Sequence, residues 1–435
     1  MIFRMDQLLS SLSMGLDAVE GELLGATTNH GKRISILAIM MGRHLGWNDD
    51  DLIGVAGCAL MHDNALTEYI LSERPEGAHA MDHGAHCLIG EENVLYFPFP
   101  SDVRGFVKYH HEYMDKSGPF KMDAAKTPLG AQIIAAADDV DARYHLQRLS
   151  PAFLPDLRGF ISSKRGGYYT CLAADALLAV LDEDLLFSLR DEQVDITFGQ
   201  KMPKWVVDMP AVDLMNIAKV VASITDYKSQ YTARHSLQIA YRAYWMGLYY
   251  GFPREQCAKI YLAASFHDIG KLLIPAAVLE KPGKLTEQEF AIIQKHAFWS
   301  YAMLKDIEGF EEICRWAVTH HRKLNGKGYP QLPQCYLDMD FTSRLIACID
   351  IYQALRETRP YHRGRSHEET IRIMGWMASH GEIDSQITGD IDRVMVLFKD
   401  SEMPGPEEAD AHFGLSSQSA GKLHYPGMAF RPAGS

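Results

Sequence analysis

The sequence lacks paired cysteines, long apolar runs and an excess of positive charge. Its seven cysteines are scattered and form no Cys-x-x-Cys pair, which is typical of reduced thiols in a cytoplasmic protein. No stretch reaches the roughly 18 uninterrupted apolar residues that a membrane span requires, and the first residues lack the apolar core of a signal peptide. These absences predict a soluble, cytoplasmic protein that does not contact a membrane.

The charge balance is acidic, with a net charge of −13 at pH 7. Such a surface repels polyanions and argues against DNA or RNA as a partner, whereas a small anionic ligand can bind where local cations outweigh the net field. The chain has 435 residues, of which 47% are apolar and 23% charged. This is the composition of a folded globular protein and the length of two domains.

The chain repeats itself. Residues 42–63 (GRHLGWNDDDLIGVAGCALMHD) and 247–268 (GLYYGFPREQCAKIYLAASFHD) share a Gly-aromatic pair, an apolar helical pattern and a final His-Asp pair. The glycine of the pair precedes the histidine by 16 positions in both segments. An internal repeat of this kind indicates two copies of one domain.

The histidines keep one spacing in both halves. The first two are 32 positions apart in each half, and the third precedes the fourth by 24 positions. A His-His pair and an apolar run ending on aspartate then follow. The repeated residues are His30, His62, Asp63, His86, His110, His111 and Asp138 in the first half, and His235, His267, Asp268, His296, His320, His321 and Asp350 in the second.

Apolar residues recur at i, i+3 and i+4 through the segments that carry these residues, and convincing alternating strands are absent. We therefore predict an all-α fold with two tandem helical domains. The expected boundaries are 1–202 for the first domain, 203–402 for the second, and 403–435 for a Pro/Gly/Ser-rich tail that packs poorly.

Imidazoles and carboxylates without a repeated cysteine form a ligand set that suits Fe, Mn or Zn with open coordination positions. Seven ligands exceed the needs of one four-coordinate ion but suit two ions that share a carboxylate, an arrangement that can clamp a phosphate and activate water. One isolated His-Asp or His-His pair would be explained as ordinary helix histidines. Because the set recurs in register, we interpret it as a metal centre in the second half and as a second candidate centre in the first.

The second half resembles the HD-GYP branch of the HD phosphohydrolases. Residues 267–304 (HDIGKLLIPAAVLEKPGKLTEQEFAIIQKHAFWSYAML) closely match that family's signature segment. They are followed by HHRKLNGKGYP (320–330) and IDIYQALRETRPY (349–361), which are similar to two further family motifs. The first half is similar but more divergent. The resemblance implies two tandem HD-type helical domains, of which the C-terminal one is catalytic.

The resemblance also implies a centre of two divalent ions per active domain, most often Fe or Mn, that hydrolyses a cyclic dinucleotide. The implied ligands are Asp268 as the bridge, with His235, His267 and Asp350 on one ion and His296, His320 and His321 on the other. Family members with three ions have a glutamate four residues before the first histidine. Tyr231 and Ala26 stand at that position in the two halves, which favours two ions.

Further residues gain expected roles from the same resemblance. Asp268 and Lys271 are the expected catalytic residues, and Lys271 would contact the scissile phosphate from the turn after the His-Asp pair. Arg359 would bind a substrate phosphate through its guanidinium fork. Tyr329, in the Gly-Tyr-Pro loop, would lie beside the substrate. Arg322, which the family motif does not share, would add a cation there.

The second half departs from the family motifs at positions that are not metal ligands. Arg322 and Asn325 replace a glutamate and an aspartate, Gln238 replaces an arginine, and Gln353 replaces an acid. Such changes can alter substrate choice, weaken activity or, for Arg322, strengthen phosphate binding. The sequence leaves these alternatives open.

In the first half all seven ligand positions are filled, and Arg33, Glu112 and Asp141 match the family. Leu66, however, stands at the lysine position, Ser-Gly-Pro-Phe replaces Gly-Tyr-Pro, and Gln147 stands at the position of the phosphate-binding arginine. Loss of one such cation typically costs several kcal/mol of transition-state stabilisation. We therefore expect a regulatory or packing domain that can still bind metal.

Three functions compete. The leading one is a metal-dependent phosphodiesterase that linearises cyclic di-GMP or 3′,3′-cyclic GMP-AMP, which hydrolases with a similar tandem arrangement cleave. The second is a catalytically weak module that binds a cyclic dinucleotide or a protein and holds structural metals, for which the departures at 322, 325 and 238 argue. The third, hydrolysis of another nucleotide, leaves the Gly-Tyr-Pro segment unexplained. A homodimer, and a signalling-protein partner that binds through the Gly-Tyr-Pro loop, stay open as partners.

Overall fold

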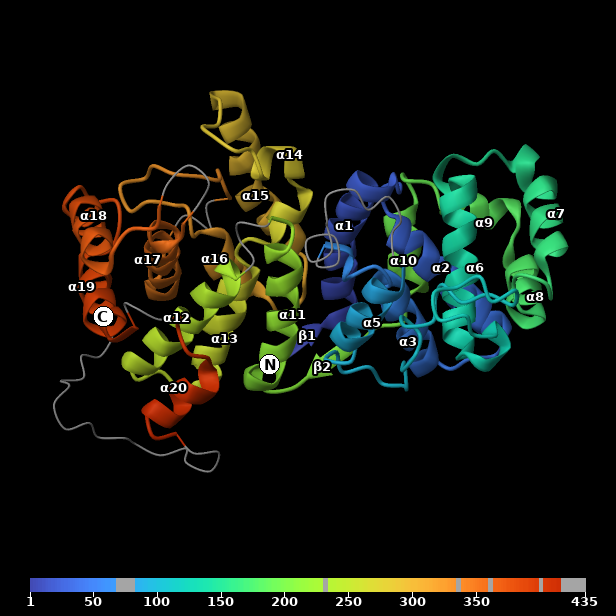
Figure 1. Ribbon diagram of the computed structural model, residues 1–435, viewed down its shortest axis with the longest axis horizontal. Coiled ribbons are helices and arrows are strands. Elements are labelled where there is room, and N and C mark those ends of the chain that lie inside the picture. Colours follow the sequence, from blue (N-terminus) through green and yellow to red (C-terminus); the bar gives the residue numbers. More distant parts are fainter. Residues whose placement is uncertain (68–82, 230–233, 334–337, 359–362, 399–401, 416–435) are drawn as a thin grey trace. The chain divides into compact units, whose positions relative to one another are not determined.

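The computed structural model describes residues 1–67, 83–229, 234–333, 338–358, 363–398 and 402–415, and its regular secondary structure over these is almost entirely helical (Figure 1). The predicted all-α fold class is confirmed. The chain forms two compact units, Ile2–Val207 and Asp208–Ser435, with Met1 belonging to the second. We call them the N-terminal unit and the C-terminal unit. The division falls at 207–208, whereas the sequence predicts it at 202–203.

The N-terminal unit is built around α2, which contacts α1, α3, α6, α8 and α10. Almost all residues of α2 are buried. The elements of this unit are β1 (Ile2–Arg4), α1 (Met5–Leu24), α2 (His30–His44), α3 (Asp49–Leu60), α5 (His83–Val94), η1 (Ala124–Lys126), α6 (Leu129–Tyr144), η2 (Leu146–Arg148), η3 (Pro151–Phe153), α7 (Leu154–Lys164), α8 (Cys171–Val180), α9 (Glu183–Ser188) and α10 (Val194–Lys201).

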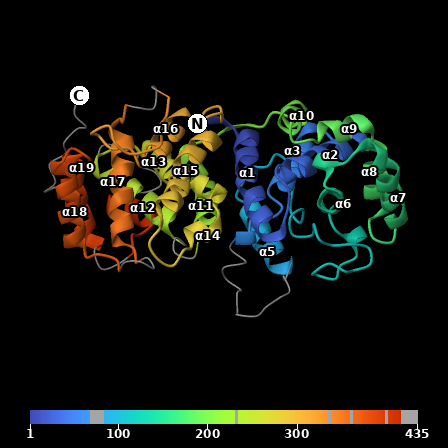
Figure 2. The ribbon, with the colours of Figure 1, turned by 90° about the horizontal axis from the view of Figure 1, so that it is seen from above.

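The C-terminal unit is built in the same way around α12, which contacts α11, α13, α17 and α20. At one end of this unit, α17, α18 and α19 pack side by side (Figures 1 and 2). After β2 (Val206–Asp208) the elements are η4 (Ala211–Leu214), α11 (Met215–Asp226), α12 (His235–Tyr249), α13 (Arg254–Phe266), η5 (Ile269–Leu273), α14 (Ala276–Leu279), α15 (Glu287–Leu304), α16 (Glu311–Val318), α17 (Phe341–Arg356), α18 (His367–Ser379), α19 (Ser385–Met395), η7 (Val396–Phe398) and α20 (Pro406–His412).

Local capping fixes where the site-bearing helices begin. Thr286 and Glu289 form a reciprocal capping box at the start of α15, and the side chain of Asp340 accepts a hydrogen bond from the backbone of Ser343 at the start of α17. These caps satisfy backbone N–H groups that the first helical turn leaves without partners. The register of α15 and α17, and therefore the direction of their histidine and aspartate side chains, follows from these starts.

Two details differ from the sequence-based expectation of helices alone. β1 and β2 pair in a two-stranded sheet, and Met5 N–H next to β1 donates to the carbonyl of Trp205 over 2.9 Å. Each strand has three residues, which is too short for an alternating pattern to be recognised.

The expectation of a poorly packed tail is wrong for residues 404–415. Trp245 Nε1–H donates to the carbonyl of Pro404 over 2.9 Å, and the Tyr244 hydroxyl donates to Asp410 over 2.9 Å. Ala409 is fully buried. Glycine and proline here mark the start of a short helix, α20, that covers α12, just as α10 covers α2. The rest of the tail, 416–435, lies outside the described residues.

Within the described part of the chain, no helix combines the length and the apolar character needed to cross a lipid bilayer. The six cysteines of this part form no disulfide. Cys335 lies outside it.

Candidate metal centre

The C-terminal unit brings the seven predicted residues together from five helical regions. The first histidine begins α12, the His-Asp pair lies between α13 and η5, the third histidine lies within α15, the His-His pair follows α16, and the last aspartate lies within α17. Among the described residues of this unit, the ligand atoms form two groups, and the atoms within each group lie within 4.8 Å of one another. They are His235, His267 and Asp268, and His296, His320 and His321.

The carboxylate of Asp268 lies between these two groups. Its Oδ2 atom is 3.1 Å from His267 Nε2 and 3.6 Å from His235 Nε2. Its Oδ1 atom is 3.3 Å from His296 Nε2 and 3.9 Å from His320 Nε2. Each oxygen therefore faces a different histidine group, which is the arrangement that a bridging carboxylate requires.

Asp350 also faces both groups. Its Oδ1 atom is 3.5 Å from His235 Nε2, and its Oδ2 atom is 3.5 Å from His321 Nδ1. The family resemblance assigns Asp350 to one ion only. In the structure its two oxygen atoms lie close to both histidine groups.

The backbone orients three of the imidazoles. The Nδ1–H groups of His267, His296 and His320 donate to the carbonyl three residues earlier, over 2.7, 2.7 and 2.6 Å. These bonds fix the tautomer and direct each Nε2 atom toward Asp268. His62 and His110 in the N-terminal unit make the same bond, to Ala59 and Val107.

The buried atoms of this cluster fit a cation. Among the described residues, His267 Nε2 and Asp268 Oδ1 have no hydrogen-bond partner, although both residues are at most 2% exposed. A buried polar atom without a partner costs about 1–3 kcal/mol. A divalent ion between these nitrogen and oxygen atoms removes that cost, because both are preferred ligands of Fe, Mn and Zn.

The protonation states of the second histidine group and of Asp268 favour metal binding as well. Burial lowers the pKa of His296 to about 3 and also lowers the pKa values of His320 and His321, so all three are neutral at pH 7. Burial by itself raises the pKa of Asp268, but the adjacent His267 and Lys271 outweigh burial and hold that pKa well below its usual range. Neutral imidazoles and an ionised carboxylate are the forms that bind a metal ion.

A glutamate that the sequence did not indicate orients the remaining histidine of the first group. Nδ1–H of His235 donates to the Glu357 carboxylate over 2.9 Å, and Gln353 donates to the same carboxylate over 2.6 Å. Burial alone lowers the pKa of His235, but Glu357 and Asp350 outweigh it and raise that pKa to about 10. The sequence feature that comes closest to indicating Glu357 is its position four residues after Gln353, directly after the end of α17.

Lys271 lies inside the cluster, as predicted from the His-Asp-x-x-Lys spacing. Its Nζ donates to Asp268 Oδ2, and its side chain is 16% exposed. The short η5 turn, in which Lys271 is the third residue, returns the side chain to the preceding aspartate.

The Gly-Tyr-Pro loop lies against the second histidine group. The ring of Tyr329 is 4.7 Å from that of His321, measured between centroids. Gly328 has φ 96° and lies so close to the His321 carbonyl that an added Cβ would be 2.3 Å from it, so only glycine fits there. Arg322 donates to the Pro330 carbonyl over 3.3 Å and thereby closes the loop.

The remaining predicted positions have other surroundings. Gln238 accepts hydrogen bonds from Arg242 and from the backbone of Met403, over 3.0 Å each, so it joins α12 to the segment before α20. Asn325 is exposed in the loop. Arg359, the expected phosphate-binding arginine, and Tyr231 lie outside the described residues.

The seven matching residues of the N-terminal unit also converge. Asp63 Oδ1 is 3.3 Å from His86 Nε2 and 3.6 Å from His110 Nε2, while its Oδ2 atom is 3.7 Å from His62 Nε2. Asp138 Oδ1 is 3.2 Å from the Nε2 atom of the first histidine, His30, and 4.0 Å from that of His62. Asp63 thus keeps the bridging geometry of Asp268, whereas the distances of Asp138 join it to the His30 and His62 side of the cluster.

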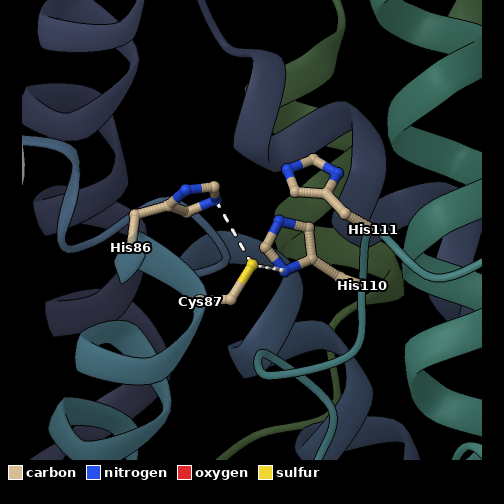
Figure 3. A group of neighbouring side chains, drawn as sticks. All are labelled: His86, Cys87, His110 and His111. Atoms are coloured by element: carbon tan, nitrogen blue, oxygen red, sulfur yellow. Dashed lines mark hydrogen bonds between the residues drawn. The ribbon is translucent and has the colours of Figure 1, made fainter. Parts of the chain in front are cut away.

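Cys87 joins the N-terminal cluster beside His86, His110 and His111 (Figure 3). Its sulfur is 3.5 Å from His86 Nε2 and 3.9 Å from His110 Nδ1. Sequence spacing missed this thiol because the matching position in the second half is Ala297, so no cysteine repeats in register.

Glu20 also reaches the N-terminal cluster. Its Oε1 atom is 3.4 Å from His30 Nε2, and it forms a group with His30 and His62 within 4.8 Å. Burial raises the pKa of Glu20 to about 8. The position does not match that of the family glutamate, which corresponds to Ala26, and a lone glutamate on α1 gives no sequence signal.

The groups around the N-terminal cluster follow the family pattern more closely than those of the C-terminal one. Nδ1–H of His30 donates to Asp141 over 2.6 Å, and Arg33 donates to the same carboxylate over 2.8 Å. Glu112 holds the loop after the His-His pair by accepting two backbone N–H groups, from Phe120 and Met122. Leu66, in place of the lysine, is buried.

Two helical units that each gather five histidines and two aspartates define a class of protein, the HD-type phosphohydrolases, whose chemistry depends on metal ions. The comparisons with known proteins agree with this class. A family model described as "HD domain" matches residues 219–387.

Relatives extend the match over most of the chain. The 3′3′-cGAMP-specific phosphodiesterase 1 of Vibrio cholerae is 30% identical over 380 residues, which are 82% of this chain and 85% of the relative. A cyclic di-GMP phosphodiesterase of Pseudomonas aeruginosa is 29% identical over 42% of this chain and 44% of the relative. The crystal structure of V-cGAP3, a cyclic GMP-AMP-specific phosphodiesterase of Vibrio cholerae, has the same fold, with a TM-score of 0.63 and 20% identity, covering 92% of this chain and 99% of that one. The chain belongs to the HD-GYP family of phosphodiesterases.

Proposed function

We propose that the C-terminal unit hydrolyses one phosphodiester bond of a cyclic dinucleotide and releases the linear dinucleotide. The observation that carries this proposal is that Asp268 and Asp350 each face both histidine groups. Two divalent ions held there, Fe or Mn, would supply Lewis-acid activation of water and of the phosphate. The relative that matches along both halves cleaves 3′3′-cGAMP, which makes this the first candidate substrate and cyclic di-GMP the second.

The residues around the ions have separate tasks. Asp268 and Asp350 hold the centre together, and the buried imidazoles keep it dry and fixed in position. Lys271 places a positive charge at the edge of the cluster, where it can bind a non-bridging phosphate oxygen and stabilise the charge that develops during P–O cleavage. Tyr329 borders the second histidine group and would contact the bound nucleotide.

The departures at Gln353 and Arg322 leave the supporting contacts in place, so the one at 322 loses its force as an argument for an inactive binding module. Glu357 takes over the task that Asp141 performs in the first half, because it accepts the Nδ1–H bond of His235. Arg322 takes over the task of Glu112, because it holds the loop after the His-His pair through a carbonyl where Glu112 uses two N–H groups. The centre therefore keeps its supporting contacts.

The test is turnover by the full-length chain. Protein loaded anaerobically with Fe(II) or Mn(II) should linearise 3′3′-cGAMP or cyclic di-GMP, detected by chromatography and mass spectrometry. Lys271→Ala should lower kcat on the order of 10²- to 10³-fold while the metal content stays the same. Lys284→Ala, which removes an exposed lysine outside the cluster, is the matched control and should keep full activity.

Other outcomes identify the alternatives. Nucleotide binding without any turnover by the metal-loaded chain would favour a binding module with structural metals. Cleavage of nucleoside phosphates in preference to both cyclic dinucleotides would assign the centre to another branch of the HD hydrolases.

A further inference from the structure

The two metal clusters differ in one ligand-type residue that sequence spacing does not reveal. In the N-terminal unit, Glu20 lies within 4.8 Å of the ligand atoms of both His30 and His62. Its Oε1 atom is 3.4 Å from His30 Nε2, about as close as Asp138 Oδ1, which is 3.2 Å away. The Nε2 atom of His62 is buried and has no hydrogen-bond partner in the part of the chain that the structure describes. Four donors thus converge on one point with an unsatisfied nitrogen among them.

The reason for the difference lies in the length of the first helix of each unit. Asp17 in α1 accepts a hydrogen bond from the backbone of Gly31 over 2.9 Å, and Asp226 in α11 accepts the equivalent bond from Ser236. Gly31 and Ser236 are both second residues of the central helix, so the two aspartates mark equivalent points. α11 ends at Asp226, whereas α1 continues to Leu24 and carries Glu20 one turn beyond its anchor.

The two clusters also differ in their charged residues. The N-terminal cluster contains three carboxylates, Glu20, Asp63 and Asp138, and the buried Leu66 stands where a lysine would be. The C-terminal cluster contains two carboxylates, and Lys271 donates to one of them. The nearby Arg33 does not compensate, because it pairs with a further carboxylate, that of Asp141. Glu20 is mostly protonated at pH 7, and a cation that displaces this proton gains a third negative charge. The metal-bound N-terminal cluster therefore holds its cation more strongly and repels a phosphate more strongly than the C-terminal cluster.

We propose that Glu20 is a metal ligand of the N-terminal unit, and that it converts this centre into one that retains its ion and does not hydrolyse phosphodiesters. Catalytic metal sites keep a coordination position open for water or substrate, whereas structural sites are closed by protein ligands. Glu20 fills a position on the His30 and His62 side that no described carboxylate of the C-terminal unit fills on the matching His235 and His267 side.

The experiment measures ion retention by the full-length chain. Wild type, Glu20→Gln and Glu22→Gln are loaded with Mn(II), dialysed against EDTA and analysed for manganese per chain. Glu22 is the matched control, because it is an exposed glutamate on the same helix. Glu20→Gln should weaken Mn(II) retention by the N-terminal unit about tenfold or more, by analogy with the effect of outer-sphere changes on metal affinity, whereas Glu22→Gln should retain it. Equal retention by the two variants would overturn the proposal.

Two further variants assign the lost ion and control for folding. Combining Glu20→Gln with His62→Ala should release no more manganese than His62→Ala alone, because both residues bind the same ion. Additive losses would contradict a shared ion. If Glu20→Gln fails to fold, Glu20→Asp keeps the charge but shortens the side chain by one methylene, and it should still retain less manganese than wild type. Retention is measured without any substrate, so a failure of the proposed phosphodiesterase activity leaves this result unaffected.

Discussion

The two units carry the same seven residues on matching helices and surround them with different charges. In the C-terminal unit a lysine donates to the bridging Asp268, and a glutamate from the end of α17 orients His235. In the N-terminal unit the lysine position is the buried Leu66, and Glu20 adds a third carboxylate. Under the proposed division of labour, a complete ligand set is not sufficient for catalysis, and the charges next to the ligands decide whether a phosphate can approach.

The largest expected effect comes from removing the bridging charge in each unit in turn. Asp268→Asn should reduce turnover by about 10³-fold or more, because metal ions contribute several kcal/mol to phosphoryl-group activation. The matched change Asp63→Asn should leave kcat within about twofold, because the first unit lacks the lysine. Both are measured as linear dinucleotide formed by full-length, Mn(II)-loaded protein. A loss of turnover in folded Asp63→Asn equal to that of Asp268→Asn would end the division of labour between the units.

An intermediate effect is expected from the carboxylates that orient the first histidine. Glu357→Gln should lower metal affinity or kcat about 10- to 100-fold, since it weakens the bond that fixes the His235 ring. Asp141→Asn, the matched change in the first unit, should lower metal retention there without lowering kcat. Titration with Mn(II) and steady-state kinetics separate the two quantities. If Glu357→Gln has wild-type metal affinity and kcat, Glu357 does not perform in the C-terminal unit the task that Asp141 has in the N-terminal unit.

Sequence spacing predicted the architecture and most of this site, and the reason is physical. Helical periodicity and the repeated His and Asp intervals can be recognised from residue spacing alone, without knowledge of local contacts. They therefore predicted the all-α fold and the convergence of both seven-residue sets. Glu20, Cys87 and Glu357 were missed because none of them recurs as the same residue at the matching position of the other half. The packed segment 404–415 was missed because its Pro and Gly residues resemble a linker, although they start α20.

Acid sensitivity should distinguish the units in metal-free protein. Burial lowers the pKa values of His296, His320 and His321, to about 3 for His296, below the roughly 6.5 expected in the unfolded chain. Such groups stabilise the fold above pH 6.5, and this contribution is lost as the pH falls toward 3, because the unfolded chain then binds protons that the folded chain does not.

The pKa of the first histidine of each unit shifts in the opposite direction. Despite burial, Glu357 raises the pKa of His235, and Glu20 raises that of His30, so their contribution is complete below pH 6.5 and is lost as the pH rises. Urea unfolding at pH 7 and pH 5, followed by hydrogen exchange in each unit, should show the C-terminal unit losing more stability on acidification. Equal losses in both units would contradict the comparison.

The smallest expected effect concerns the last helix of each unit. Asp410→Asn weakens the bonds that Tyr244 and Arg254 make to α20, and it should cost the C-terminal unit about 1 kcal/mol of unfolding free energy. Asp195→Asn in α10 removes only the partner of Lys32 and is 68% exposed, so it should change stability by less than about 0.5 kcal/mol. Urea denaturation of both variants measures the difference. No effect of Asp410→Asn would show that the contacts of α20 add little.

The most direct measurement for the whole account is anomalous X-ray diffraction, at the absorption edge of the metal, from crystals of the Mn(II)- or Fe(II)-loaded full-length chain. The account predicts two peaks in the C-terminal unit, one against His235 and His267 and one against His296, His320 and His321, with Asp268 between them. Absence of metal from that cluster in fully loaded protein would contradict the account, and so would an ion bound by only one of the two histidine groups.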